Sequence, residues 1–229
     1  MELMIPLVIA HRGFSGRYSE NTLAAIRAAI RLGVDFVEID VHETADGKLI
    51  VFHDYRLNRI CGQPGRIRDT TAARLRQLHP AIPTLGEVLR TCRGNTRVLI
   101  EIKRADPGKV AAAIRRHRMQ QQVIVFTFSK RRLAEFAAVA PRIPRFALLD
   151  QPDWNSTAVT VGGLGVNYRH LRSRRRVARL HQRGWKVFAW TVNQPAVMRR
   201  LISWGVDGLI TNFPDRALRE RRRTVTGRI

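Results

Sequence analysis

Short stretches of the chain carry side chains that can move protons or hold anions. His11 and Arg12 directly follow an apolar run at Leu7–Ala10, and His53 closes a second, shorter run. An imidazole at the end of a strand can transfer a proton, and an arginine beside it can bind an anion. Taken alone, a histidine in such a place more often has a structural hydrogen-bonding role. The pattern therefore becomes informative only together with its neighbours.

Carboxylates gather on one face of another apolar run. In residues 34–42 (VDFVEIDVH), the two-residue period of a strand puts Glu38 and Asp40 on one face and the valines and isoleucine on the other. Two such carboxylates lie about 6.5–7 Å apart along a strand. At an effective dielectric constant near 20, their repulsion costs roughly 2–3 kcal/mol, so a cation must compensate. Glu101, at the end of the next main run, adds a third carboxylate.

Three carboxylates with no cysteine among them favour a hard cation that prefers oxygen ligands, either Mg²⁺ or Ca²⁺. The alternative is a structural ion-pair network in which Arg12 and Lys103 neutralise the acids, and the spacing alone does not decide between the two. Two imidazoles, His11 and His53, beside a cation and these bases suit hydrolysis of a phosphate ester. One imidazole would take a proton from the nucleophile and the other would give one to the leaving oxygen.

The elements that must position these residues form an alternating series. Apolar runs typical of strands alternate with helical patterns, which indicates a parallel α/β architecture, and eight such strands can close a TIM (β/α)8 barrel. A doubly wound open sheet is the alternative, but no GxGxxG motif follows the first strand. The predicted strands are Leu7–Ala10, Asp35–Val41, Arg97–Ile102, Val123–Phe128, Arg145–Leu149, Leu164–Asn167, Lys186–Val192 and Gly208–Thr211. The predicted helices are Thr22–Leu32, Gly108–Met119, Lys130–Ala140, Ser173–Arg183, Pro195–Trp204 and Pro214–Arg222.

Three segments depart from this repeat. Residues 42–95 are too long for one connection, and we expect a small insertion there with an antiparallel strand at Lys48–His53 and short helices at Thr71–Leu78 and Thr84–Thr91. The polar linker Asp150–Gly163 suggests that one helix is missing. Residues 216–229 form a basic C-terminal tail on the last helix. No linker divides the chain, so residues 1–229 are interpreted as one domain.

Composition limits the class of protein further. The 229 residues carry a formal net charge of +23, but 45% of them are hydrophobic, which excludes a disordered polybasic chain. No run of about 18 apolar residues exists, and the first ten residues resemble a strand more than a secretion signal. With only two cysteines, a cytoplasmic location is expected. The first 54 residues hold eight of the 18 acids but only five of the 41 bases, so acids concentrate where the proposed site lies.

Taken in order, the motifs closely resemble those of the glycerophosphodiester phosphodiesterase family. The resemblance runs from about residue 8 to 215. It rests on residues 8–13 (VIAHRG), 19–23 (SENTL), 37–41 (VEIDV), 44–47 (TADG), 51–54 (VFHD), 82–85 (IPTL), 100–103 (IEIK), 190–193 (WTVN) and 205–214 (GVDGLITNFP).

This resemblance implies a TIM barrel with a small insertion between its second and third strands. It also implies hydrolysis of glycerophosphodiesters, such as glycerophosphocholine or glycerophosphoethanolamine, to sn-glycerol 3-phosphate and an alcohol. The residue roles it implies are His11 and His53 as the general acid and base, Glu38, Asp40 and Glu101 as ligands of Mg²⁺ or Ca²⁺, Arg12 and Lys103 as phosphate contacts, Glu20 near the metal site, and Trp190 on the glycerol or head-group side. Residues 20–22 also fit an ordinary helix start with Asn21 as its cap, and Trp190 also fits the barrel core.

Two other functions remain open at this stage. A lysophospholipase D would use the same site on lysophospholipids, but the short insertion offers no long apolar stretch for an acyl chain. The net charge also fits a module that binds nucleic acid or an anionic membrane. No zinc-finger, RRM or KH pattern supports specific nucleic-acid recognition. We therefore expect a small-molecule substrate, with at most a weak electrostatic association with polyanions, and the sequence does not indicate the oligomeric state.

Overall fold

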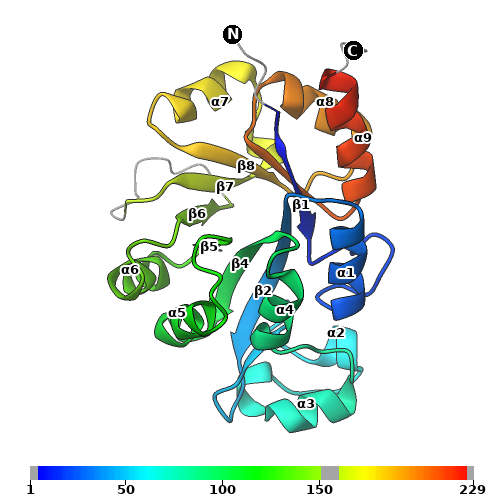
Figure 1. Ribbon diagram of the computed structural model, residues 1–229, viewed down its shortest axis with the longest axis vertical. Coiled ribbons are helices and arrows are strands. Elements are labelled where there is room, and N and C mark those ends of the chain that lie inside the picture. The colour runs from blue at the N-terminus through cyan, green and yellow to red at the C-terminus, as the bar shows by residue number, and fades with distance from the viewer. Residues whose placement is uncertain (1–4, 151–159, 226–229) are drawn as a thin grey trace.

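The computed structural model describes residues 5–150 and 160–225 of the chain. Within these ranges, eight parallel strands form a closed ring (Figure 1). They are β1 (Leu7–His11), β2 (Phe36–Glu43), β4 (Arg97–Arg104), β5 (Val123–Thr127), β6 (Arg145–Leu149), β7 (Gly163–Asn167), β8 (Lys186–Trp190) and β9 (Gly208–Thr211). Neighbours in the ring pair in the order β1-β9-β8-β7-β6-β5-β4-β2, and β1 also pairs with β2. The predicted TIM barrel is therefore confirmed, and the open doubly wound sheet is wrong.

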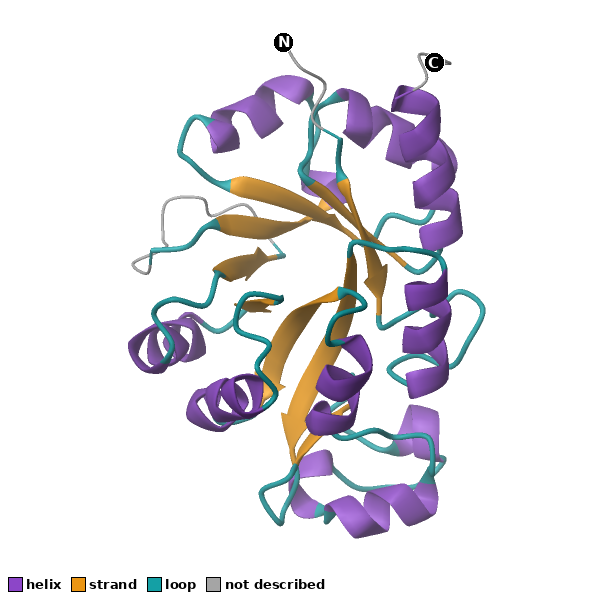
Figure 2. Ribbon diagram, viewed as in Figure 1, coloured by secondary structure: helices purple, strands orange, loops and turns teal. Residues whose placement is uncertain are grey.

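Helices surround the ring on its outside (Figure 2). These are α1 (Leu23–Arg31), α4 (Leu85–Cys92), α5 (Pro107–Arg116), α6 (Lys130–Val139), α7 (Arg174–His181), α8 (Pro195–Ser203) and α9 (Pro214–Val225). Each turns an apolar stripe to the strands, as in α1, where Ala25, Ile26 and Ala29 are buried. Side-chain oxygens cap the helix starts, for example Asp106 on α5 and Ser129 on α6. The main core therefore lies between the strands and the helices.

A second core fills the inside of the barrel. Its members come from alternate positions of seven strands and are Ile9, Phe36, Leu99, Phe126, Phe146, Leu148, Phe188 and Ile210. The remaining strand, β7, contributes glycines, because a Cβ on Gly163 would lie 2.6 Å from the Phe146 ring and one on Gly165 would lie 2.6 Å from Leu148. Large side chains on one side thus fill the space that β7 leaves open. The interior is a packed layer that forms the floor beneath the carboxyl ends of the strands.

The segment between β2 and β4 forms the insertion. It contains β3 (Leu49–Val51), which pairs antiparallel with β2 outside the ring, then α2 (Asn58–Cys61), a 3₁₀ turn at Ile67–Asp69, and α3 (Ala72–Leu78). Its own small core includes Ile50, Leu57 and Leu75. In Figure 1, α2 and α3 lie at the end of the molecule away from α7 and α8. The extra strand and α3 match the prediction, whereas the four-residue helix α2 has no helical period and was not predicted.

The other departures from the predicted elements are small. The predicted strand Lys186–Val192 is too long: β8 ends at Trp190, and Val192 N donates to Ile210 O on β9 instead. Within the linker Asp150–Gly163, residues 151–159 lie outside the described residues, as do residues 226–229 of the basic tail. In the part of the chain that the structure describes, no helix has the length and apolar character needed to cross a membrane.

Candidate active site

The carboxyl end of β1 positions His11 over the barrel floor. Its Nδ1 lies 2.6 Å from Asn212 Oδ1, just after β9, and its Nε2 lies 3.9 Å from Glu38 Oε2. Burial, followed by the charge of Arg12, lowers the pKa of His11 to about 4. Because the amide oxygen of Asn212 accepts from the protonated Nδ1, Nε2 is left as the free, basic nitrogen of the ring. His11 is therefore a neutral imidazole near pH 7.

The backbone after His11 turns sharply toward the neighbouring strand. Arg12 has a φ of 55°, in the left-handed region that residues other than glycine seldom adopt. This turn lets Arg12 N donate to Glu38 Oε2 at 2.9 Å. At Gly13, which follows with a φ of 79°, an added Cβ would lie 2.7 Å from the backbone of Ala25, so the close approach of α1 requires glycine there.

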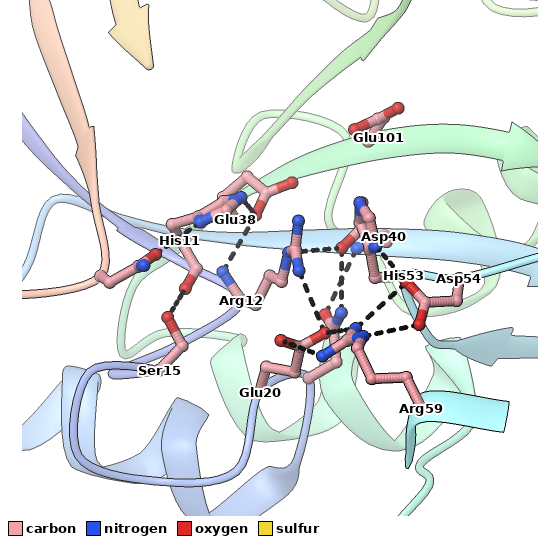
Figure 3. A network of polar contacts seen from close by, with 12 residues as sticks. His11, Arg12, Ser15, Glu20, Glu38, Asp40, His53, Asp54, Arg59 and Glu101 are labelled. Carbon is pink, nitrogen blue, oxygen red and sulfur yellow. Dashed lines mark hydrogen bonds and ion pairs between the residues drawn. The ribbon is translucent and has the colours of Figure 1, made fainter. Parts of the chain in front are cut away.

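Three carboxylates meet where β2 and β4 end. Glu38, Asp40 and Glu101 are all buried, and one oxygen of each lies within 4.8 Å of the others. The register of the parallel strands sets Asp40 opposite Glu101, so the predicted face of β2 and the end of β4 converge on one point. Figure 3 shows Glu38 and Asp40 side by side on the same strand, with Glu101 across from them. Together they form the only cluster of acids, histidines or cysteines among the described residues that is compact enough to hold a metal ion.

The carboxylates differ in how their charge is compensated. Burial, and then the charge of Asp40, raises the pKa of Glu38 well above its usual value. The same two causes raise the pKa of Glu101 to about 8. For Asp40, burial also opposes ionisation, but the charges of Arg12 and Lys103 outweigh it and hold the pKa of that carboxyl below its usual value. The protein alone thus stabilises one carboxylate of the three fully.

Two basic side chains stand among the acids. Arg12 Nε lies 3.2 Å from Asp40 Oδ2, and Lys103 Nζ lies 3.0 Å from Glu101 Oε1 and 3.5 Å from Asp40 Oδ1. The pKa of Lys103 is raised, because Asp40 and Glu101 together outweigh the burial that opposes its charge. Ion pairing of this kind is what the structural alternative expected. Among the described residues, however, it leaves three acids facing two bases, and Glu38 has no lysine or arginine side chain within ion-pair distance.

Asn21 has a different place from the one expected. The N-cap of α1 is Thr22, whose side chain accepts from Ala25 N, so the prediction of Asn21 as the cap is wrong. Asn21 has a φ of 57° and turns inward, where its Nδ2 donates to Asp40 Oδ2 at 2.9 Å. Asn21 is only 3% exposed, and its hydrogen bond fixes the position of the buried Asp40 carboxylate. Asparagine tolerates the left-handed conformation better than most residues, which allows this turn.

The insertion brings in the second histidine. His53, two residues after β3, has its Nδ1 2.6 Å from Asp54 Oδ1, and Asp54 in turn accepts hydrogen bonds from Arg59 on α2. Burial lowers the pKa of His53, because it outweighs the charge of Asp40 and the hydrogen bond with Asp54. His42, buried on β2, lies with its Nε2 3.1 Å from the carbonyl oxygen of His53. Both the ring and the backbone of His53 are therefore held.

Most of the predicted site residues line one cavity of about 230 Å³. Its polar side is lined by His11, Arg12, Glu38, His53, Glu101 and Lys103. Its apolar side is lined by Phe126, Phe128, Leu148, Trp190 and Ile210. The Trp190 ring packs edge-on against Phe128, which is 47% exposed at this side. Charged groups and aromatic rings therefore face one another across a space that can hold a small polar molecule.

Two predicted residues lie off this cavity wall. Asp40 lies behind its lining, and Glu20 accepts from Arg12 Nη1 at 3.0 Å and pairs with Arg59 without contacting the acids. Sequence reasoning did not identify three residues that hold the site residues in place. Asn212 contacts His11, Arg59 contacts Asp54 and Glu20, and His42 contacts the His53 carbonyl oxygen. Asn212 stands within the GVDGLITNFP motif and could have been found there. Arg59 and His42 carry no comparable signal of spacing.

Comparisons with known proteins show the family and the fold of the chain. Residues 11–216 match the model of the glycerophosphoryl diester phosphodiesterase family. A glycerophosphodiester phosphodiesterase of Bacillus subtilis is 32% identical, over 91% of this chain and 84% of its own length. One from Bacillus altitudinis is 33% identical, over 93% of this chain and 97% of its own length. A phosphodiesterase of Oleispira antarctica, solved with its product sn-glycerol-3-phosphate, superposes with a TM-score of 0.84 at 27% identity, covering 94% of this chain and 96% of that one.

Proposed function

The chain belongs to the glycerophosphoryl diester phosphodiesterase family of enzymes, and from this premise we propose that it is a metal-dependent hydrolase of deacylated phospholipids. Its substrates would be glycerophosphodiesters such as glycerophosphocholine and glycerophosphoethanolamine, cleaved to sn-glycerol 3-phosphate and an alcohol. The observation that carries this proposal is the meeting of three buried carboxylates and two imidazoles around one small cavity. The product bound to the Oleispira antarctica relative supports the same product here.

Glu38, Asp40 and Glu101 would hold the divalent cation, Mg²⁺ or Ca²⁺. The residues fit such an ion, because all three offer oxygen ligands within 4.8 Å of one another and two bases leave their charge incompletely matched. Asp40 Oδ1 is buried and accepts no hydrogen bond from the described residues, with Lys103 Nζ 3.5 Å away, so it has a lone pair available. When bound, the cation supplies charge neutralisation to the phosphoryl oxygens and lowers the pKa of bound water.

Arg12 and Lys103 would bind the phosphate. Both line the cavity beside the acids, and each already lies in an ion pair that fixes its position. The Lys103 ammonium has three donors, and its pairs with Asp40 and Glu101 leave capacity for a phosphoryl oxygen. A dianionic transition state would gain from these fixed charges without any reorganisation of the site.

The two histidines would divide the proton transfers according to their partners. His11 faces the neutral amide of Asn212 and presents a free Nε2, so it would accept the proton of the nucleophile. His53 faces the carboxylate of Asp54, whose hydrogen bond opposes the effect of burial and favours the protonated ring, so His53 would protonate the leaving alkoxide. Each group would contribute about 10²–10⁴-fold to the rate.

A comparison of leaving groups tests this division. A substrate that releases a nitrophenolate needs no proton on the leaving oxygen, whereas choline does. We expect His53→Ala to lose about 10²–10⁴-fold on glycerophosphocholine but much less on a nitrophenyl ester of glycerol phosphate. His11→Ala should lose equally on both. Equal losses for both variants on both substrates would contradict the assignment, and full activity of a folded His11→Ala protein would contradict the proposed mechanism.

The apolar side of the cavity would receive the glycerol or the head group, with Trp190 as part of this wall. It is also the feature that favours a second candidate activity, hydrolysis of lysophospholipids by a lysophospholipase D. A cavity of about 230 Å³ is small beside the roughly 300–1,000 Å³ of pockets for drug-sized ligands. The size therefore favours the deacylated substrate.

The deciding experiment is an assay of released glycerol 3-phosphate and free alcohol over a panel of substrates. Glycerophosphocholine, glycerophosphoethanolamine and lysophosphatidylcholine are compared with EDTA and with added Mg²⁺ or Ca²⁺. We expect cation-dependent release of glycerol 3-phosphate from the first two. Turnover of lysophosphatidylcholine alone would favour the second activity, and no turnover of any diester would overturn the proposal.

A further inference from the structure

We propose that Arg59 is a positioning residue for hydrolysis, through which the insertion orients His53 and Arg12 at the same time. This inference rests on the proposed function, because the reactive roles of His53 and Arg12 come from it. Arg59 lies on α2, outside the barrel, and does not line the cavity. It therefore acts through other side chains, and these are Asp54 and Glu20.

One guanidinium group binds both carboxylates at once. Arg59 Nε donates to Asp54 Oδ2 at 2.7 Å and Nη2 donates to Asp54 Oδ1 at 3.1 Å. Nη2 also donates to Glu20 Oε1 at 2.6 Å, and Nη1 donates to Glu20 Oε2 at 3.1 Å. Four of the five N–H donors of the side chain are thus used in two forked pairs. Figure 3 shows Arg59 between the two acids.

Each of the two carboxylates also contacts a residue that lines the cavity, so fixing the carboxylate fixes that residue. Asp54 Oδ1 lies 2.6 Å from His53 Nδ1, so the carboxylate that Arg59 fixes sets the plane and the tautomer of that imidazole. Glu20 Oε1 accepts from Arg12 Nη1 at 3.0 Å, while Arg12 Nε lies against Asp40. A continuous chain of contacts therefore runs from His53 through Arg59 to Arg12.

The charge balance supports a positioning role. Burial opposes ionisation of Asp54, but the hydrogen bonds from Arg59 and His53 lower the pKa of Asp54 to about 2. Arg59 thereby keeps Asp54 ionised. The Arg59 guanidinium also neutralises part of the Asp54 charge, so His53 does not face an uncompensated carboxylate. The Arg59 side chain is 49% exposed. Half-exposed ion pairs add little to the free energy of unfolding, so their conformational effect on the cavity matters more than their contribution to stability.

Steady-state kinetics of matched variants test the proposal. We expect Arg59→Ala to lower kcat on glycerophosphocholine by about 10- to 100-fold, the usual range for residues that orient a site residue, with KM changed less than kcat. Arg59→Lys should lose nearly as much, because an ammonium cannot form two forked pairs. Arg56→Ala is the control, since its exposed side chain, three residues earlier, has no ion pair within the described ranges. It should keep wild-type kcat.

A double-mutant cycle with Asp54→Asn separates positioning from a general effect on folding. If Arg59 acts through Asp54, the two losses in kcat combine to much less than their product, because the second change removes a restraint already lost. Losses that multiply fully would overturn the proposal. So would a folded Arg59→Ala or Arg59→Lys protein with kcat within threefold of wild type. If the alanine variant does not fold, the lysine variant, which keeps the charge, decides.

The outcomes distinguish this inference from the proposed function. A wild-type protein that releases no glycerol 3-phosphate would contradict the proposed function itself. An active wild type with unchanged Arg59 variants would contradict only the role of Arg59. An equal fall in kcat in Arg56→Ala would also overturn it, because the effect would then belong to positive charge on the insertion in general.

Discussion

The two ends of the barrel both carry buried or half-buried carboxylates, but they use them differently. At the amino end, Asp35 and Asp207 precede β2 and β9. Asp35 Oδ2 accepts from Val8 N at 2.7 Å and pairs with Arg221 on α9. Asp207 Oδ2 accepts from Val187 N at 2.8 Å and lies 2.8 Å from His181 Nε2. Each acid there has a backbone donor and a basic side chain of its own.

At the carboxyl end, Glu38, Asp40 and Glu101 share their partners. One oxygen from each lies within 4.8 Å of the others. Within the described ranges, Arg12 and Lys103 are the only lysine or arginine side chains in ion pairs with these three acids. Burial, and then the charge of Asp40, raises the pKa values of Glu38 and Glu101. Crowded carboxylates of this kind raise the free energy of the folded protein. They are therefore expected where a bound ligand compensates their charge.

This difference in charge compensation between the two ends distinguishes acids that stabilise the fold from acids that are candidates for function. A carboxylate that ties the start of one strand to its neighbour, with all donors supplied by the protein, stabilises the barrel. A cluster of carboxylates whose charges the protein matches only in part is available for a cation and a substrate. In TIM barrels this second kind is expected at the carboxyl ends of the strands, where active sites lie.

Removal of the cation should have the largest effect and most directly tests this contrast. We expect EDTA to reduce hydrolysis of glycerophosphocholine to background and added Mg²⁺ or Ca²⁺ to restore it. The same ion should raise the midpoint of thermal unfolding, because it binds only the folded protein. Activity that persists in EDTA, with no thermal shift on adding either ion, would make the carboxyl-end acids an ion-pair network like those at the other end.

Glu38→Gln should come next in size. Gln keeps the shape and can still accept from Arg12 N, but it removes one ligand charge. We expect kcat/KM to fall by about 10³-fold, which corresponds to about 4 kcal/mol. In cation-free buffer the unfolding midpoint should stay equal or rise, since a repelling charge is gone. The control is Glu135→Gln on α6, an acid away from the site whose partly exposed side chain pairs with Arg131. It should change neither quantity, and a large loss of stability in Glu38→Gln would contradict a functional role for Glu38.

Asp207→Ala should show the opposite pattern. The change leaves the buried Val187 N without its acceptor, which costs about 1–3 kcal/mol of the free energy of unfolding. For a chain of this size, each kcal/mol lowers the midpoint by roughly 2–4 °C. The kcat of the folded variant should equal that of wild type, measured well below the midpoint. Loss of kcat without loss of stability would contradict a purely structural role for Asp207.

Arg221→Ala should have the smallest effect. The pair with Asp35 is partly exposed, and Asp35 still accepts from Val8 N without it. We expect about 0.5–1 kcal/mol of destabilisation, measured by urea unfolding, with unchanged activity. A loss larger than that of Asp207→Ala would mean that exposed pairs, more than buried backbone acceptors, hold the amino end together.

Much of the fold could be predicted from periodicity. The alternation in residues 34–42 correctly put Glu38 and Asp40 on the face opposite Val37, Ile39 and Val41, which pack against the helices. The extra strand was also found, because Asp46-Gly47 marks a turn. By contrast, α2 is a single turn of helix held by its surroundings, and so short a segment has no period to detect.

The site was less accessible to the same reasoning. The roles proposed for His11, the acids and His53 rest on residue type and motif order, and they stay predictions. Asn21 was assigned to the wrong role, because an Asn before a helix and an Asn bound to a carboxylate look alike in sequence. Arg59 gave no signal at all, since its two partners stand five and 39 positions away along the chain.

The sequence by itself determined the barrel, the family and the types of group available for chemistry, because these depend on local period, turn residues and the order of motifs. Tertiary structure decided which acids crowd together and which stand apart with partners of their own. That choice depends on strand register, which sets Asp40 opposite Glu101, and on the ring closure that brings His11 to Asn212 across 201 positions. Charge balance between such distant groups is a property of distances in space, and the linear chain does not contain those distances.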